Sequence, residues 1–114
     1  MYNPDCPTRR VLDRVADKWT VLIVGALEKG TLRFGHLRRE VGGISPKVLT
    51  ETLRALERDG ALTRTVYASV PPRVEYSLTK LGRSLAALLR SVRLWAEANI
   101  ETVLASQKAH DSAP

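Results

Sequence analysis

Hydroxyl and cationic side chains gather on one side of a predicted helix within the stretch ISPKVLTETLRALERDG, residues 44–60. The apolar side of this helix repeats at helical spacing and holds Leu49, Leu53 and Leu56. The polar side begins at the start of the helix and holds Ser45, Pro46, Lys47, Thr50 and Arg54. Serine and threonine hydroxyls donate to phosphate or to base edges, and an arginine can bind guanine O6 and N7 together. The chemistry of this side is therefore hydrogen bonding to a polyanion such as a nucleic acid.

The ends of this helix follow from local chemistry. Ser45 is a suitable N-cap, the proline after it suits the first helical position, and Gly60 ends the helix. We therefore predict a helix over 45–59 whose N-terminal N–H groups and partial positive charge favour phosphate. Glu51 lies on the same polar side, where it repels phosphate unless it accepts from a cytosine amine or pairs with Lys47.

Three further cations are candidate phosphate contacts. Lys18 stands at the start of a predicted buried helix, and Arg33 precedes a short one. Arg73 lies at the tip of a predicted hairpin beside two prolines, a position suited to a phosphate or a narrow minor groove. For each of the three, the alternative is an ordinary solvated surface charge.

The sequence shows none of the motifs that support catalysis or a bound metal. It has no glycine-rich phosphate loop, no CxxC pair and no HExxH pattern. His36 and His110 are too far apart in the chain for their spacing to indicate a site. We therefore expect no enzyme, no cofactor and no metal site.

Positive charge is concentrated in the body of the chain. The 114 residues contain 18 Lys and Arg against 12 Asp and Glu, which gives a net charge of +6. Residues 1–93 hold 17 of the basic and 9 of the acidic side chains (+8), whereas 94–114 hold 1 and 3 (−2). This distribution indicates a polyanionic partner that contacts the body. A solvated basic surface is equally compatible with the charge alone.

Length and composition indicate one globular domain in the cytoplasm. A hydrophobic fraction of 44% over 114 residues supports a single core but not two. No apolar run approaches the ~18 residues of a membrane helix, and the N-terminus lacks the apolar segment of a signal peptide, so we expect no membrane partner. The single cysteine cannot form an internal disulfide, so the fold does not depend on oxidising conditions.

The segments around the polar helix form the frame that positions it. In chain order we predict helices over 7–16, 17–30, 34–41 and 45–59, strands over 61–68 and 73–78, and a last helix over 79–105. A Gly-Gly turn joins the third and fourth helices, and the two strands surround a tip that contains two prolines. Two short helices joined in this way and followed at once by a β-hairpin make a winged helix-turn-helix.

The predicted fold class is therefore α+β, mainly α: a winged helix-turn-helix with an N-terminal helix and a long C-terminal dimerisation helix. Residues 1–114 are expected to form one domain, with the core and wing at 6–79, the dimerisation helix at 80–105 and a flexible tail at 106–114. In this geometry the helix at 45–59 lies in the major groove of double-stranded DNA, and the hairpin reaches the backbone or the minor groove.

The last helix carries more apolar surface than a domain of this size can cover. Large apolar residues recur at steps of four and three: Leu81, Leu85, Leu88, Val92 and Trp95, with Ile100 farther on. About 25 residues at 1.5 Å each give a length of roughly 37 Å. A second copy of the chain can cover this stripe, so we predict a twofold homodimer. The alternative is a helix that packs wholly on its own domain.

Three segments resemble the HxlR-type winged helix-turn-helix transcriptional regulators of bacteria: CPTRRVLDRVADKWTVLIVGAL, LRFGHLRREVGGISPKVLTETLRALERDGALTRTVY and VPPRVEYSLTKLGRSL. The resemblance runs from about Cys6 to Trp95. It implies cytoplasmic homodimers that bind roughly palindromic operators, with the helix at 45–59 as the recognition helix and the tip at 68–73 as the wing. It also implies a dimer interface that joins the first and last helices: Val11, Leu12, Leu85, Leu88, Val92, Trp95 and Ile100.

Cys6 is the single candidate for a reactive group. It precedes a helix start, and Arg9 and Arg10 lie one turn on, all of which favour the thiolate, whereas Asp5 opposes it. The resemblance implies a sensing role, because several members of the family sense electrophiles, hypochlorite or disulfide stress through a cysteine at this position. With no second cysteine in the chain, oxidation needs the partner's Cys6 or a small thiol. A packed, inert thiol is the alternative.

A winged-helix module that binds RNA or another protein is the alternative function. A sequence-specific DNA binder prefers its operator by ~10³-fold or more over random duplex and loses affinity steeply with salt, whereas such a module shows no duplex preference. Whether a small-molecule effector binds is left open by the sequence: a cleft between the long helix and the wing could hold one, but no convergent polar residues mark it.

Overall fold

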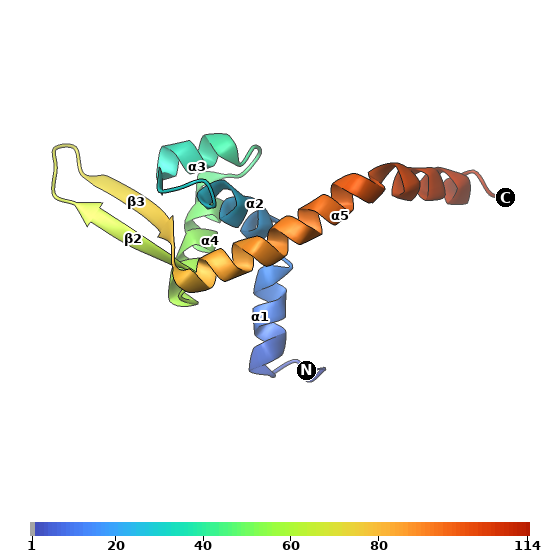
Figure 1. Cartoon of the computed structure of the whole chain (residues 1–114), viewed down its shortest axis with the longest axis horizontal. Coiled ribbons are helices and arrows are strands. Elements are labelled where there is room, and N and C mark those ends of the chain that lie inside the picture. The colour runs from blue at the N-terminus through green and yellow to red at the C-terminus, as the bar shows by residue number, and fades with distance from the viewer. Residues whose placement is uncertain (1) are drawn as a thin grey trace.

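Within residues 2–114, the chain forms five helices and a small antiparallel sheet (Figure 1). The computed structural model describes residues 2–114, so the first residue of the predicted 1–114 domain lies outside the described part. The elements are α1 (Pro7–Val15), α2 (Lys18–Leu27), β1 (Leu32–Arg33), α3 (Phe34–Glu40), α4 (Pro46–Arg58), β2 (Leu62–Tyr67), β3 (Arg73–Leu78) and α5 (Lys80–Asp111). The predicted class, a mainly helical winged helix-turn-helix, is confirmed.

Helix α2 forms the centre of the core because its side chains are apolar on nearly every side. Ile23 and Val24 are fully buried. They belong to one cluster with apolar residues of α3, α4, the sheet and the first turns of α5. The side chain of Asp17 caps the helix by accepting from the N–H groups of Trp19 at 2.8 Å and Thr20 at 3.3 Å. This cap fixes where α2 starts relative to the turn from α1.

Helix α4 begins and ends where its local sequence predicts, within one residue. Ser45 Oγ accepts from the N–H of Val48 at 3.1 Å, and Pro46 occupies the first helical position. Gly43 and Gly60, on either side of the helix, both have φ +83°, a conformation that L side chains rarely adopt. These glycines therefore fix how the polypeptide enters and leaves α4.

The three strands pair in the order β1-β3-β2, and the β2–β3 hairpin projects from the body as the wing (Figure 1). Leu62 pairs with Leu78 at the base of the hairpin, and Arg64 pairs with Tyr76 two rungs farther out. Because directly opposed residues share a face and faces alternate along a strand, Arg64 lies on the same face as the buried Leu62. The row of side chains that faces the core at the base of the hairpin thus continues along the same face of the wing, beyond the core.

Helix α5 runs six residues farther than predicted. It spans 32 residues, about 48 Å at 1.5 Å per residue, and extends well past the rest of the domain (Figure 1). Residues 106–111, predicted to belong to a flexible tail, continue the helix instead. Good helix formers such as Gln107, Lys108 and Ala109 allow the backbone hydrogen bonds to propagate without tertiary contacts.

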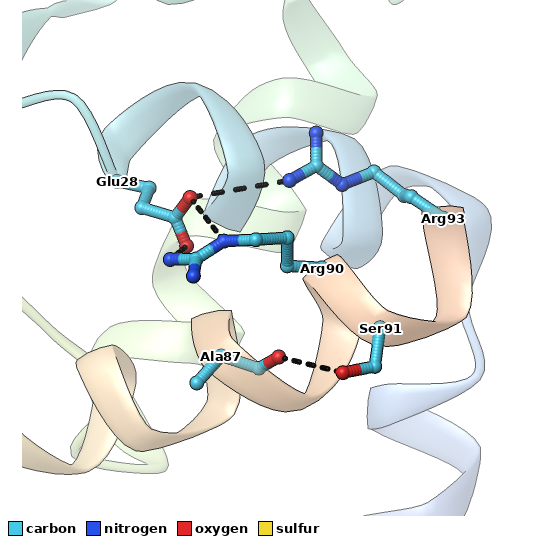
Figure 2. A network of polar contacts seen from close by, with 5 residues as sticks. All are labelled: Glu28, Ala87, Arg90, Ser91 and Arg93. Carbon is cyan, nitrogen blue, oxygen red and sulfur yellow. Dashed lines mark hydrogen bonds and ion pairs between the residues drawn. The ribbon is translucent and has the colours of Figure 1, made fainter. Parts of the chain in front are cut away.

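An ion-pair network joins the end of α2 to the middle of α5 (Figure 2). Arg90 Nη2 lies 2.8 Å from Glu28 Oε2, and Arg90 Nε donates to Glu28 Oε1 at 3.1 Å. Arg93 Nη2 is 4.0 Å from Glu28 Oε1. Two arginines of α5 thus converge on one carboxylate of α2, which sets the rotation of α5 about its own axis.

This network predicts a pH-dependent contribution to stability. The hydrogen bond from Arg90 lowers the pKa of Glu28 from its ordinary value of 4.5, and the charges of Arg90 and Arg93 act in the same direction. The stabilisation is therefore present above pH 4.5 and is lost as the pH falls through the folded-state pKa. We expect Glu28→Gln to lower the melting temperature by about 2 °C at pH 7, and the difference to shrink in acid.

Thermal unfolding followed by circular dichroism between pH 7 and pH 3 measures this difference. Glu97→Gln, on the exposed part of α5, is the matched control and should change little at any pH. An equal loss for Glu28→Gln at both pH values would contradict the assigned ion pair.

Candidate nucleic-acid interface

Helix α4 presents a polar face to solvent, because its three leucines are buried in the core. Lys47 and Arg54 are exposed on this face, and Thr50 is half-buried beside them. Pro46 has no N–H, and the N–H of Val48 is already bonded to Ser45 Oγ. At the N-terminus of α4, the donors left for an anion are therefore the N–H of Lys47 and the hydroxyl hydrogen of Ser45. These are fewer than at a helix start that has no proline and no capping side chain.

Glu51 lies among these cations without neutralising them. Its side chain is exposed, and in residues 2–114 no ion pair within 4.0 Å joins it to Lys47. The Lys47–Glu51 pair that the sequence allowed is therefore not formed in this structure, and Lys47 has no ion-pair partner within 4.0 Å among the described residues.

Arg73 was predicted to lie at the hairpin tip, but it is the first residue of β3. Its side chain contacts two neighbouring residues of the hairpin. Its guanidinium carbon lies 4.2 Å from the ring centre of Tyr67, its cross-strand partner. Its Nε is 3.9 Å from Glu75 Oε1. Strand pairing also sets Arg33 opposite Glu75. Arg33 and Arg73 thus lie on the outer face of the sheet, opposite to the face that carries Arg64.

Lys18, the remaining predicted contact, is exposed at the start of α2. Its Nζ lies 4.3 Å from the ring centre of Trp19, which packs against the core. The tryptophan face thus holds the ammonium group through a cation–π contact while leaving it accessible. The structure therefore keeps Lys18 available at the surface, separate from the α4 face.

Arg64 is the functional candidate that sequence reasoning missed. It lines a groove of about 310 Å³ between α4, the start of α3 and the sheet. The groove is bordered by Phe34, Thr50, Leu53, Arg54, Glu57, Arg64 and Tyr76. The sequence feature that could have indicated Arg64 is the alternation of Leu62, Arg64 and Val66, which sets an arginine on the core-facing row of a strand. Convergent polar residues therefore line this groove between α4 and the sheet.

The apolar stripe of α5 is open to solvent in the single chain. The exposed fractions are 57% for Leu88, 51% for Val92, 64% for Trp95 and 48% for Ile100. On α1, Val11 is 61% and Leu12 is 45% exposed. Leu85 differs, because it is half-buried and packs against the core of its own chain. Its place in a dimer interface stays a prediction, and part of its side chain is already covered by its own domain.

Cys6 occupies the N-cap position of α1 and is half-buried. Hydrogen bonds from the backbone N–H groups of Arg9 and Thr8 lower the pKa of its thiol, and partial desolvation opposes them. The guanidinium of Arg9 instead donates to the carbonyl of Tyr2 at 2.6 Å. The helix start, and not the arginine charges, is therefore the main cause of the lowered pKa.

Together these features define a class of protein. Helices α3 and α4 are joined by a glycine turn, α4 exposes cationic and hydroxyl groups, and a β-hairpin wing follows directly. This is the arrangement of a winged helix-turn-helix protein, in which the second helix of the pair is the DNA-recognition element. The chain belongs to the HxlR-like helix-turn-helix family of transcriptional regulators, which it matches over residues 14–103.

Relatives of known sequence and structure agree with this assignment. The helix-turn-helix transcriptional regulator YtfH of Escherichia coli K12 is 48% identical over 105 residues, which cover 92% of this chain and 83% of the relative. The structure of YtfH from Salmonella typhimurium superposes with a TM-score of 0.89 at 46% identity, covering 95% of this chain and 96% of that one. The redox regulator HypR in its oxidised form gives a TM-score of 0.75 at 40% identity over 82% and 97% of the two chains.

These relatives are transcriptional regulators, which confirms the expectation that the protein is not an enzyme. Within residues 2–114, no helix has the length and apolarity needed to cross a membrane. The described side chains also contain no group of three His, Cys, Asp or Glu residues close enough to hold a metal ion.

Proposed function

We propose that the protein is a cytoplasmic, sequence-specific regulator that binds a roughly palindromic operator in double-stranded DNA as a homodimer. The exposed polar face of α4, between the glycine turn and the wing, carries this proposal. Lys47 and the α4 N-terminus contact phosphate, Arg54 reads a base edge, and Thr50 supports it. Lys18, Arg33 and Arg73 contribute sequence-independent attraction to the backbone.

The apolar surfaces of α1 and α5 support the homodimer. In one chain both helices expose large side chains at their predicted stripes, and the second half of α5 extends beyond its own domain (Figure 1). A twofold pairing that crosses the α5 helices covers both stripes at once. With the two α4 helices one turn of DNA apart, half-sites are expected about 34 Å or ~10 bp from centre to centre.

Arginine substitutions test the roles on DNA. We expect Arg54→Ala to weaken operator binding by ~1–3 kcal/mol and to relax base preference at one position, because a bidentate base contact is lost. Arg73→Ala should weaken binding to all duplexes equally and by less than Arg54→Ala weakens operator binding. The reason is that Tyr67 and Glu75 hold its side chain on the outer face of the sheet. Fluorescence anisotropy with operators selected from a random pool measures both effects.

Lys29→Ala is the matched control, since it removes one exposed positive charge at the opposite end of α2 from Lys18. Equal, sequence-independent losses for Arg54→Ala and Arg73→Ala would contradict base reading by Arg54. Failure of the selection to yield any preferred duplex would favour the alternative of an RNA- or protein-binding module.

A redox response through Cys6 is a second candidate, favoured by the lowered pKa of its thiol and by the relative HypR, which is named a redox regulator. We expect iodoacetamide to modify Cys6 faster at pH 7 than an unstructured cysteine peptide, because more of it is thiolate. Diamide, which takes two protons and two electrons from two thiols, should then change operator affinity in the wild type but not in Cys6→Ser. An identical response of the two proteins would exclude the sensor.

A further inference from the structure

We propose that the groove between α4 and the wing sheet binds a small aromatic carboxylate that also carries a hydrogen-bond donor. The groove has a volume of about 310 Å³, at the lower end of the range of about 300–1,000 Å³ for sites that take small ligands. Residues from α3, α4, β2 and β3 line it, so that it exists only in the folded protein.

Two arginines supply the charge of this site. Arg54 comes from α4 and Arg64 from β2, and both are exposed. Among the described residues neither side chain takes part in an ion pair within 4.0 Å. Two guanidinium groups without an ion-pair partner among the described residues, one from α4 and one from β2, are suited to a carboxylate, since each can donate two parallel hydrogen bonds.

The rest of the lining favours a ring over a bare phosphate. Phe34 adds a half-buried aromatic ring to the lining, and Leu53 and Tyr76, which are buried in the core, add a smaller apolar contribution. A phosphate gains nothing from these apolar atoms, whereas an aromatic ring can pack against them. Glu57 also lines the groove, where its carboxylate repels a phosphate but accepts from a hydroxyl group.

The position of the groove gives the ligand a consequence for regulation. Arg54 and Thr50 line the groove and also belong to the α4 face to which we assign the operator contact. Ligand and operator therefore compete for Arg54. This consequence rests on the proposed function, whereas binding of the ligand itself does not.

Calorimetric titration of the DNA-free protein with three probes tests the site. We expect 4-hydroxybenzoate to bind about tenfold or more tightly than 4-hydroxybenzyl alcohol, which lacks the carboxylate, and more tightly than benzoate, which lacks the donor. Arg64→Gln should weaken 4-hydroxybenzoate about tenfold or more, while Arg58→Gln, on the same helix as Arg54 but outside the groove, should not. Circular dichroism checks that both variants fold.

Equal binding of the three probes, an unchanged affinity in Arg64→Gln, or binding of inorganic phosphate as tightly as 4-hydroxybenzoate would overturn the proposal. In a second step, 4-hydroxybenzoate should displace the selected operator from the wild type but not from Arg64→Gln. Binding of 4-hydroxybenzoate without displacement of the operator would reject the competition for Arg54 and keep the binding site. A protein that binds the ligand but no specific duplex would retain the site and reject the proposed function.

Discussion

The double variant Val92→Glu, Trp95→Glu should be a folded monomer that binds operator at least about a hundredfold more weakly than the wild type. Both side chains are more than half exposed in the single chain, so their replacement leaves the core intact. In the proposed dimer they are expected to be covered, where each large apolar side chain would contribute about 1.5–3 kcal/mol. Two linked recognition helices gain about 10²–10⁴ in affinity over one, and a monomer loses this gain.

Light scattering at micromolar concentration measures the mass, and anisotropy with the selected operator measures the affinity. Ala87→Glu, Ala98→Glu is the matched control, because it adds the same two charges to exposed small residues of α5. A wild-type mass for the Val92, Trp95 variant would place the dimer interface elsewhere. A monomeric mass for the wild type would reject the homodimer.

Gly82→Ala should destabilise the protein by about 3 kcal/mol, the largest single-site effect on folding that we expect. Gly82 is buried in the first turn of α5, and an added Cβ would overlap the carbonyl oxygen of Ala61 and crowd Leu78. The backbone cannot move aside easily, because Ala61 O accepts from the N–H of Thr79 at 3.0 Å, and Thr79 Oγ1 donates to Gly60 O at 2.6 Å.

Urea unfolding followed by circular dichroism gives the change in free energy of unfolding. Gly35→Ala in α3 is the control, since the nearest atom to its added Cβ is a guanidinium nitrogen of Arg39 at 3.7 Å. We expect this control to stabilise the protein by about 0.5–1 kcal/mol through the higher helix propensity of alanine. Similar changes in the free energy of unfolding for both variants would show that the backbone at Ala61 can shift to accommodate the added Cβ.

Local sequence determined where α4 begins and ends and which segments flank it. Ser45, Pro46 and Gly60 define the ends of α4 through contacts with residues at most a few positions away. The alternation of residues along the two strands likewise follows from the chain itself, so the hairpin was predictable, whereas its register came from the structure. Capping and alternation depend on neighbours in sequence, which is why a single sequence was sufficient for the winged helix-turn-helix.

Only the tertiary structure decided which charges are available. Sequence spacing favoured Arg73 as the wing contact, but strand pairing sets it over Tyr67 and beside Glu75. The same pairing sets Arg64 in the lining of one groove with Arg54, ten residues away along the chain. Glu28 meets Arg90 across 62 residues, which no local pattern indicates. Such contacts depend on the packing of α4, α5 and the sheet around one core, so they exist only once the elements are assembled.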